Sequence, residues 1–548
     1  MSKKASNGRS IDDFIEEQNR RKKGGSDLRQ APHQDGSEAR RESYREPQEI
    51  RRGSYDDGNG GGRGGEPKKR KRKLGIILVI IQLVLSVLVM GMLFMLNMFP
   101  TKYLIIGGAV LAVLWIIALV TQFSKGKAHI VGKIISIAVC VLIAVAMYYV
   151  LITNNMLSAI TKSGKNTYNI AAAVREDDPA QSIYDAAGYS FGIQTRYSRE
   201  QVDEAIEGIN KDLGTQINVV VYDSALDMVN GLMSGNVDAI IYNTNLDSTL
   251  DELYGGDKPF SESIRILTNI KIETQEEETE NARSVEDVAE DCFAIYISGN
   301  DTYELSELGR SDVNIIAFVN PNSKQVLLVS TPRDYYLTFP GVTGDSRDKL
   351  THAGWYGIEC SMDTLEQLYG CEINYNIKVN FNAVIKMVDS LGGVTVNNEI
   401  AFTSNAGIYF PQGEVYMDGK TALEYVRERK HIASGDNQRG RNQMAVLSAM
   451  IDKAMSPSII TSYASIMSEM SDCMVTSMTD SEIKKFVKMQ LDDGGSWNVK
   501  SVNATGFNSN DYCYTLGAYS YVMEPDSESI NAIKTQIDAL YRGEVLSE

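Results

Sequence analysis

The chain has 548 residues, with 54 lysines and arginines against 71 aspartates and glutamates, and its formal net charge is −17. This length predicts more than one domain. The negative charge excludes a general nucleic-acid binder, because a polyanionic partner favours a basic surface.

Residues 1–73 combine charged residues, serine and glycine with almost no apolar residues. Such a segment buries too little surface to offset the entropy lost on ordering its backbone. It is therefore predicted to be a disordered cytoplasmic tail. The tail ends in the basic run KKRKRK, Lys68–Lys73, directly before the first apolar segment.

Three long, nearly uncharged apolar segments follow within residues 74–153. A hydrocarbon core about 30 Å thick is crossed by about 20 apolar residues in a helix, and each segment reaches that length. Buried helices of a soluble protein are the alternative, but these segments lack a polar face. Three transmembrane helices are predicted, at roughly Leu74–Phe99, Tyr103–Phe123 and Ile130–Ile152.

The basic residues around these segments predict their orientation. The run Lys68–Lys73 precedes the first segment, and only Lys102 lies between the first and the second. Three lysines surround the connection between the second and third segments: Lys125, Lys127 and Lys133. Because basic flanks favour the cytoplasmic side, the N-terminus is predicted inside and everything from Thr153 onward outside the cell membrane.

Residues 165–276 are predicted to form a small α/β accessory domain. Three segments have the composition of strands: YSFGIQT, INVVVY and VDAIIYN. They alternate with two amphipathic helical patterns, and this order predicts a parallel sheet. In FGIQT and LMSGNVDAIIYN the segment resembles one lobe of an extracellular solute-binding protein. Contacts with proteins or the cell wall are the expected role, and ligand binding is the alternative. The acidic residues 277–291 are the predicted linker.

Five of the six cysteines lie outside the predicted membrane segments, where disulfides are chemically permitted. Cys360–Cys371 and Cys473–Cys513 are possible pairs by proximity, and ordinary buried thiols are the alternative. The pairing therefore stays open.

Residues 292–548 are predicted to form a second exported domain. The first three predicted strands are FAIYISG, VNIIAFV and VLLVSTP, and the turn NPNSK joins the last two. Further predicted strands alternate with helical patterns. This mixture predicts an α/β/α domain with a central mixed sheet and helices on both faces.

Acidic and arginine residues recur at the ends of these predicted strands. Asp301 and Asp312 could hold Mg²⁺, which prefers one or two carboxylates together with substrate phosphate oxygens and water. Arg333 follows VLLVST, and ligands gather beyond the carboxyl ends of strands in open α/β sheets. Asp334 could orient Arg333, accept a proton or cap the turn.

A second basic cluster follows in YVRERK and GDNQRGRNQ. Arg427 and Arg429 share a face only in extended chain, so the preceding helix must end close to Tyr425 if both touch one diphosphate. One guanidinium group can bind two phosphate oxygens at once, so several guanidinium groups at one site would neutralise a diphosphate. A solvated basic surface is the alternative. The remaining candidates are Asp436, Arg439, Arg441 and Gln443.

The motifs GND…GRSD, STPRD, DKLTHAG, VNFNAVIKMVDSLGGV, YVRERK and GDNQRGRNQ together resemble the LytR–CpsA–Psr (LCP) family of cell-wall glycopolymer transferases, over about Phe293 to Lys453. The resemblance implies a membrane-tethered extracellular domain that transfers a polyprenyl-pyrophosphate-linked glycan to peptidoglycan. It implies Mg²⁺ on Asp301 and Asp312. It also implies a pyrophosphate-binding set, with the following members: Arg333, Arg427, Arg429, Arg439 and Gln443.

The chain departs from the family pattern in two ways. Arg439 is followed by Gly440, Arg441, Asn442 and Gln443, whereas members often have arginine-x-x-arginine-glutamine, so the second arginine of the motif is not assigned. Members commonly have one transmembrane helix, not three. The alternatives to a transferase are a polyprenyl-pyrophosphate phosphatase that uses water as the acceptor, and a non-catalytic envelope sensor. The general base stays unassigned, with Asp334 and Asp436 as candidates.

Overall fold

The computed structural model describes residues 68–124, 127–161, 165–275, 283–300, 305, 308–432, 435–454, 469 and 473–546. They belong to one unit, Pro67–Glu548. The predicted disordered tail lies outside the described residues, apart from its basic end.

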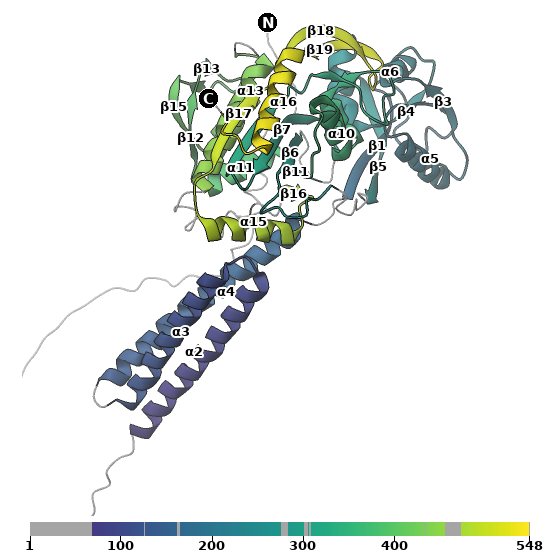
Figure 1. Cartoon of the computed structure of the whole chain (residues 1–548). Helices are drawn as coiled ribbons and strands as arrows, with labels where there is room; N and C mark the ends of the chain where they lie inside the picture. The colour runs from purple at the N-terminus through teal and green to yellow at the C-terminus, as the bar shows by residue number, and fades with distance from the viewer. Residues whose placement is uncertain are drawn as a thin grey trace, which may run out of the picture. The chain divides into compact units, whose positions relative to one another are not determined.

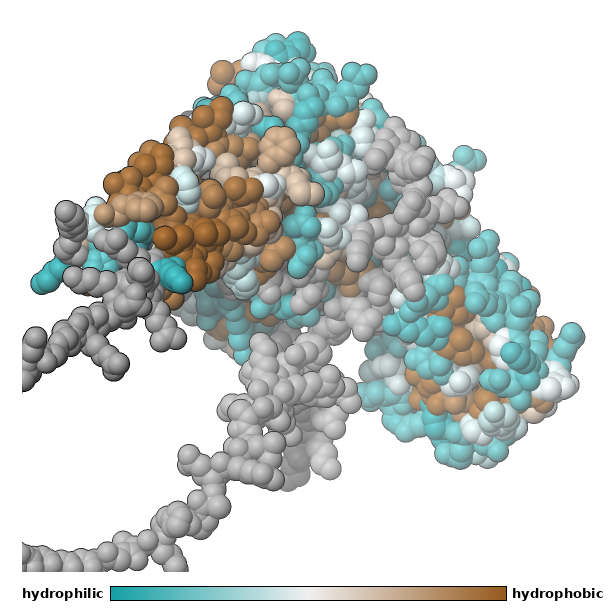
Figure 2. All heavy atoms as spheres, turned by 90° about the horizontal axis from the view of Figure 1, so that it is seen from below, coloured by the Kyte–Doolittle hydropathy of each residue, from teal (hydrophilic) through white to brown (hydrophobic). Residues whose placement is uncertain are grey.

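Three helices form a bundle at the start of the described chain (Figure 1). Each is long and apolar enough to cross a membrane, and their large exposed hydrophobic side chains form the main brown area of Figure 2. Between the helices, Ser136 donates a hydrogen bond to Gln82 Oε1 (2.8 Å) and Trp115 Nε1 donates one to the carbonyl of Val79 (3.1 Å). Such polar contacts join helices within lipid. The predicted membrane anchor is confirmed, with helices α2 (Lys68–Leu96), α3 (Thr101–Phe123) and α4 (Ala128–Ile160).

Helix α4 is longer than the predicted segment. Its 33 residues span about 50 Å, well beyond a hydrocarbon core of about 30 Å. Its last turns carry Met156, Leu157 and Ile160, which pack with Met474 of β16 and Ile377 of β11. The end of the membrane helix is therefore part of a hydrophobic cluster with the sheet to which these two strands belong.

A five-stranded sheet covers Lys165–Gln275 in the order β3-β2-β4-β1-β5. Strands β2, β3 and β4 are parallel, as predicted, but β1 runs antiparallel to both β4 and β5, so the sheet is mixed. The sequence reasoning missed β1 and β5, because alanine-rich NIAAAVR and polar LTNIKIETQ lack the composition of typical strands. We call this part the accessory lobe. Its elements are β1 (Lys165–Arg175), β2 (Ser190–Gln194), α5 (Arg199–Leu213), β3 (Asn218–Tyr222), α6 (Ala225–Met233), β4 (Ala239–Asn243), η1 (Thr244–Leu246), α7 (Asp247–Leu253), α8 (Phe260–Ser263) and β5 (Ile264–Gln275).

The second half of the predicted linker packs against the part of the chain that follows it. Arg283 forms ion pairs with Asp363 (2.5 Å) and Glu366 (3.2 Å), and Val288 is buried in a hydrophobic cluster with Phe293. Residues 276–282 lie outside the described residues, and the domain boundaries at 165–276, 277–291 and 292–548 stay predictions.

A six-stranded mixed sheet lies at the centre of the part that follows the accessory lobe, as predicted, in the order β16-β11-β6-β7-β8-β17. We call this part the central domain. Strand β11 is parallel to β6 and β17 is parallel to β8, while β7 lies between β6 and β8 and is antiparallel to both. The turn NPNSK joins β7 to β8 as predicted, with Lys324 at φ +51°. The strands are β6 (Phe293–Asn300), β7 (Ser311–Asn320), β8 (Gln325–Ser330), β11 (Tyr375–Asn380), β16 (Met474–Thr476) and β17 (Asn498–Asn503).

Helices cover both faces of this sheet (Figure 1). Successive side chains of a strand point to opposite faces. On β7, Ile316 and Phe318 pack beneath the helices on one face, and Ile315 and Ala317 pack against Met444 on the other. The helices are α9 (Leu350–Ala353), η2 (Gly354–Tyr356), α10 (Ile358–Tyr369), α11 (Phe381–Ser390), α12 (Gly419–Arg427), α13 (Gly435–Ala454), α15 (Asp480–Asp493) and α16 (Ser527–Tyr541).

Short antiparallel strand pairs complete the central domain. All six cysteines of the chain are free thiols. Neither possible disulfide is present. The pairs are β9 (Tyr336–Leu337) with β10 (Asp348–Lys349), β12 (Val394–Asn398) with β15 (Gly413–Met417), β13 (Phe402–Thr403) with β14 (Tyr409–Phe410), and β18 (Gly506–Cys513) with β19 (Ala518–Pro525).

Candidate functional site

A pocket of about 480 Å³ lies at one edge of the central sheet, within the range of small-molecule sites. Strands β6, β8 and β11 end at this edge, and the antiparallel strand β7 begins there. Asn300 and Asn380, the last residues of β6 and β11, line the pocket together with Asp312 near the start of β7. The pocket therefore occupies the position where α/β sheets collect their ligands.

Five arginines from four separate segments line this pocket. One precedes β7, one follows β8, two stand at the end of α12 and one lies on α13. Among the described residues, the carboxylates of the lining are Asp312 and Glu252. Such an excess of guanidinium groups suits a ligand with several negative charges, because each group can bind two phosphate oxygens. The five are Arg310, Arg333, Arg427, Arg429 and Arg439.

Asp312 is the counter-charge of this cluster. Its Oδ1 accepts hydrogen bonds from Arg333 Nη1 (2.7 Å) and Thr351 Oγ1 (3.1 Å), and the side chains of Asp312 and Arg333 are only 17% and 11% exposed. Burial would raise the pKa of Asp312, but the positive charges of Arg333, Arg310 and Arg439 outweigh it and hold the pKa well below the usual range of a carboxyl. Asp312 is therefore ionised at neutral pH.

Asp334 lies outside the pocket lining. Its buried carboxylate is 3.7 Å from Arg333 Nε and 4.0 Å from Lys349 Nζ. Of the three roles considered for Asp334, the one that these contacts support is orienting Arg333. They do not place it as a substrate ligand or as a base.

Arg427 and Arg429 face the same pocket because α12 ends between them. The helix stops at Arg427, two residues beyond the expected end, and Glu428 is extended (φ −68°, ψ 131°). The buried Glu428 carboxylate accepts hydrogen bonds from the backbone N–H groups of Arg429 (2.9 Å), Lys430 (2.8 Å), His431 (3.1 Å) and Asn405 (2.5 Å). One side chain thus fixes the bend that places both arginines.

Glycine at position 440 lets α13 approach the sheet closely. A Cβ there would lie 3.1 Å from Ser330 Oγ and 3.2 Å from Asn503 Oδ1, which is tighter than most contacts of real Cβ atoms. The preceding residue, Arg439, is 7% exposed and lines the pocket. One turn on, Gln443 also lines it and donates a hydrogen bond to the carbonyl of Val426 (3.3 Å), which joins α13 to α12.

Arg441 belongs to a different surface. Its Nε donates to Glu399 Oε2 (2.9 Å) and Gln438 Oε1 (3.0 Å), and it does not line the pocket. Residues two apart on a helix point about 200° away from each other, so Arg439 and Arg441 cannot face the same pocket. The second arginine of the family motif has no counterpart at Arg441.

Six of the ten predicted residues line the pocket: Asp312, Arg333, Arg427, Arg429, Arg439 and Gln443. Asp301 and the side chain of Asp436 lie outside the described residues. The sequence reasoning missed Arg310, although it stands in the quoted motif GRSD directly before β7. The helical pattern AVIKMVDSL was considered as a wall for a prenyl chain, with core packing as the favoured alternative, and its Val384 on α11 does line the pocket. Leu423 and Val426 of α12, which also line it, were not singled out from the sequence.

Replacing Glu428 by glutamine is expected to lower the free energy of unfolding by about 1–3 kcal/mol at neutral pH, because an amide cannot accept from all these buried N–H groups. Burial would raise the pKa of Glu428, but its hydrogen bonds to His431, Asn405 and Lys430 lower it below the usual value of 4.5. The stabilisation is therefore present above about pH 4.5 and is lost as the pH falls through the lowered pKa. The thermal unfolding of the two proteins should differ at pH 7 and converge in acid.

Glutamine at Glu424, on the same helix but with no such set of backbone donors among the described residues, is the matched control for this experiment. It should change the free energy of unfolding by less than about 0.5 kcal/mol. A Glu428→Gln protein as stable as the original at pH 7 would contradict the assignment.

The LytR_cpsA_psr family matches residues 262–538. The polyisoprenyl-teichoic acid–peptidoglycan teichoic acid transferase TagU of Enterococcus faecalis is 34% identical over 218 residues, which cover 39% of this chain and 71% of that protein. TagU of Oceanobacillus iheyensis is 33% identical over 254 residues, which cover 45% of this chain and 75% of that protein. Among solved structures, TagV of B. subtilis aligns at a TM-score of 0.39 and 26% identity, over 47% of this chain and 99% of TagV.

Fold and pocket define a membrane-anchored α/β/α protein with a cationic site at the sheet edge. The chain belongs to the LytR_cpsA_psr family. The family predicted from the motifs is confirmed.

The described part of the pocket offers a possible magnesium ligand in Asp312. Among the described residues there is no group of three or more histidine, cysteine or acidic side chains that could hold a metal. Mg²⁺ needs no such group when substrate phosphates supply the other oxygens. The hydrogen bonds that Asp312 makes within the described chain go to Oδ1. An ionised carboxylate in a phosphate-sized pocket therefore fits a substrate-bridged metal.

Proposed function

We propose that this chain is a membrane-anchored transferase that moves a glycopolymer from a polyprenyl pyrophosphate carrier to a hydroxyl of peptidoglycan. The observation that carries the proposal is the convergence of five arginines and Asp312 in one pocket with an apolar wall. A diphosphate fits the cationic part, and a prenyl chain fits the wall formed by Val384, Leu423 and Val426. The names of the TagU relatives describe the transfer of teichoic acid to peptidoglycan.

The arginines would act by binding and by electrostatic stabilisation. As the acceptor hydroxyl bonds to the phosphorus next to the sugar, the bond from that phosphorus to the bridging oxygen breaks, and polyprenyl phosphate leaves with the added charge. Fixed guanidinium groups stabilise such developing charge without reorganising. Arg333 and Arg439 lie at the buried end of the pocket with Asp312, whereas Arg427 is exposed near its mouth.

Mg²⁺ on Asp312 and Asp301 is part of this proposal. When bound, the ion would supply positive charge to the diphosphate oxygens. Of the two candidates for the general base, Asp334 lies outside the pocket lining, which leaves Asp436 as the candidate.

The orientation is also a proposal: N-terminus in the cytoplasm and the chain from Lys165 onward outside. The basic flanks of α2 and α4 support it. The chemistry requires it as well, because peptidoglycan is the acceptor and lies outside the membrane.

The test uses the full chain in sealed membrane vesicles, with a lipid-pyrophosphate disaccharide and soluble peptidoglycan fragments. Vesicles whose outer leaflet carries the exported part should form glycan covalently joined to peptidoglycan, and inverted vesicles should not. Chelating divalent ions should slow the transfer at least about 100-fold, and added Mg²⁺ should restore it. Release of free glycan phosphate alone would instead establish a phosphatase, and no consumption of the lipid in any vesicle would refute the proposal.

A further inference from the structure

One side of the pocket is formed by the accessory lobe. Ser248 and Glu252, both on α7, line the same pocket as the five arginines. They are four residues apart and so share one face of the helix. Both precede residue 262, where the match to the family begins. This wall therefore lies outside the region that the chain shares with the family.

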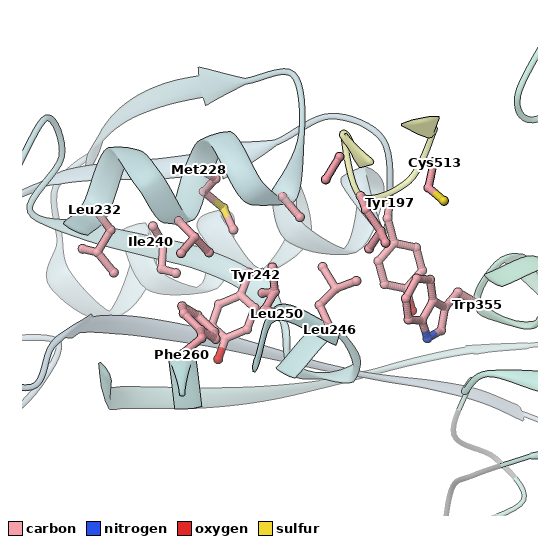
Figure 3. Packing of buried hydrophobic residues seen from close by; sticks show 14 of the residues in the cluster. Tyr197, Met228, Leu232, Ile240, Tyr242, Leu246, Leu250, Phe260, Trp355 and Cys513 are labelled. Atoms are coloured by element: carbon pink, nitrogen blue, oxygen red, sulfur yellow. The ribbon is translucent and has the colours of Figure 1, made fainter. Parts of the chain in front are cut away.

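Helix α7 is fixed in place by the core of the lobe. Leu246 and Leu250 are completely buried beside Tyr242 and Phe260 (Figure 3). Ser248 and Glu252 are exposed and line the pocket. A helix with one buried side and one pocket side holds its polar side chains in a defined position.

The lobe and the central domain share that hydrophobic core. Trp355 and Cys513 of the central domain belong to the same cluster as the lobe residue Tyr197, whose ring centre lies 5.6 Å from that of Trp355 (Figure 3). Arg196 Nη1 donates to the carbonyl of Tyr514 (2.5 Å), and its guanidinium stacks on the Tyr514 ring at 5.0 Å. The lobe is thus packed against the central domain rather than tethered to it.

The lobe also contacts the segment that leads into the site. Asn245, just before α7, donates a hydrogen bond to the carbonyl of Leu308, which is buried two residues before Arg310. The turn that leads into α7 thus contacts the segment that precedes a pocket arginine. Contact at two points, on the wall and on this approach, makes the lobe part of the site.

The five arginines give their side of the pocket, the arginine wall, a positive charge, whereas the wall formed by α7 carries the negative charge of Glu252. A carboxylate repels phosphate unless a cation bridges the two, so Glu252 does not bind the diphosphate directly as the arginines do. It accepts hydrogen bonds from hydroxyl groups, and a serine hydroxyl donates and accepts. Vicinal hydroxyls of a neutral sugar satisfy both side chains, whereas a second phosphate at this position would be disfavoured.

We propose that α7 of the accessory lobe is the sugar-binding wall of the transfer pocket, with Ser248 and Glu252 as specificity residues for a neutral, hydroxylated sugar. This inference rests on the proposed function of the same pocket. The sugar is either the one attached to the diphosphate or the acceptor sugar of peptidoglycan.

The experiment compares Ser248→Ala, Glu252→Gln and the double variant with Glu204→Gln, an exposed carboxylate of α5 that does not line the pocket. The full chain is assayed in vesicles with a lipid-pyrophosphate disaccharide and peptidoglycan fragments, each varied in turn. Inorganic pyrophosphate binding is measured by calorimetry on the same proteins. This measurement reports on the arginine wall alone, because pyrophosphate carries no sugar.

In the double variant, loss of hydrogen bonds to the sugar should raise the KM for one substrate about tenfold or more, with pyrophosphate affinity within about threefold of the original. A raised donor KM assigns the wall to the lipid-linked sugar, and a raised acceptor KM assigns it to peptidoglycan. Glu204→Gln should change neither. The inference is overturned if both KM values stay within twofold, or if pyrophosphate binding falls as much as sugar-dependent activity does. If the unsubstituted chain shows neither transfer nor pyrophosphate binding, the proposed function itself fails.

Discussion

Replacement of Arg439 by alanine is expected to lower the transfer rate by about two to three orders of magnitude, the effect of removing one preorganised donor from a site that stabilises developing charge. Arg439 is 7% exposed, lines the pocket and contributes to holding the Asp312 carboxyl ionised. A guanidinium in this desolvated position acts more strongly than one in water.

The matched control is Arg441→Ala, two positions along the same helix. Arg441 interacts with Glu399 and Gln438 away from the pocket, so its loss should change the transfer rate by about twofold at most. Arg439→Lys keeps the charge but loses the planar fork, and an intermediate rate is expected. The measurement is the initial rate of transfer in vesicles. Thermal unfolding of each protein shows whether the substitution has disrupted the fold. If the transfer rate falls equally in Arg439→Ala and Arg441→Ala, the pocket is not the site of transfer.

Asp312→Asn is expected to abolish the proposed effect of Mg²⁺ on the site. The substitution keeps the shape of the side chain but removes the counter-charge of Arg333, Arg310 and Arg439. Binding of pyrophosphate without metal should therefore become about 5–10-fold tighter, because one nearby negative charge is gone. In contrast, the tightening that Mg²⁺ gives to the unsubstituted protein should disappear, and the transfer rate should fall at least about 100-fold.

The same substitution should cost stability. Leaving three largely buried guanidiniums without their carboxylate is expected to lower the free energy of unfolding by on the order of 3 kcal/mol. Added pyrophosphate should recover part of this loss, since a ligand that binds only the folded protein stabilises it. Calorimetry with and without Mg²⁺, together with thermal unfolding, measures both effects. An Asp312→Asn protein whose pyrophosphate binding still responds to Mg²⁺ would exclude Asp312 as a metal ligand.

The parts of the site that could be predicted from sequence are those set by local pattern. Arg333 follows a run of buried residues that had to be a strand, and the ends of strands meet at one edge of the sheet. From the sequence, the helix had to end close to Tyr425 only if Arg427 and Arg429 bind one diphosphate. The sequence does not show the cause of this bend, which is that Glu428 binds four backbone N–H groups. Arg439 was predicted to bind pyrophosphate and Arg441 was a further candidate, and the orientation of α13 places only Arg439 at the pocket.

By itself, the sequence determined the membrane anchor, the α/β/α class and the family, because apolar length, strand and helix periodicity and ordered motifs are properties of neighbouring residues. Only the tertiary structure decided that the accessory sheet is mixed, that Asp334 lies behind Arg333, and that Ser248 and Glu252 form a wall of the pocket. These features join residues that are far apart in the chain. They depend on how buried faces pack against one another, and Trp355 and Tyr197 meet in one core for that reason.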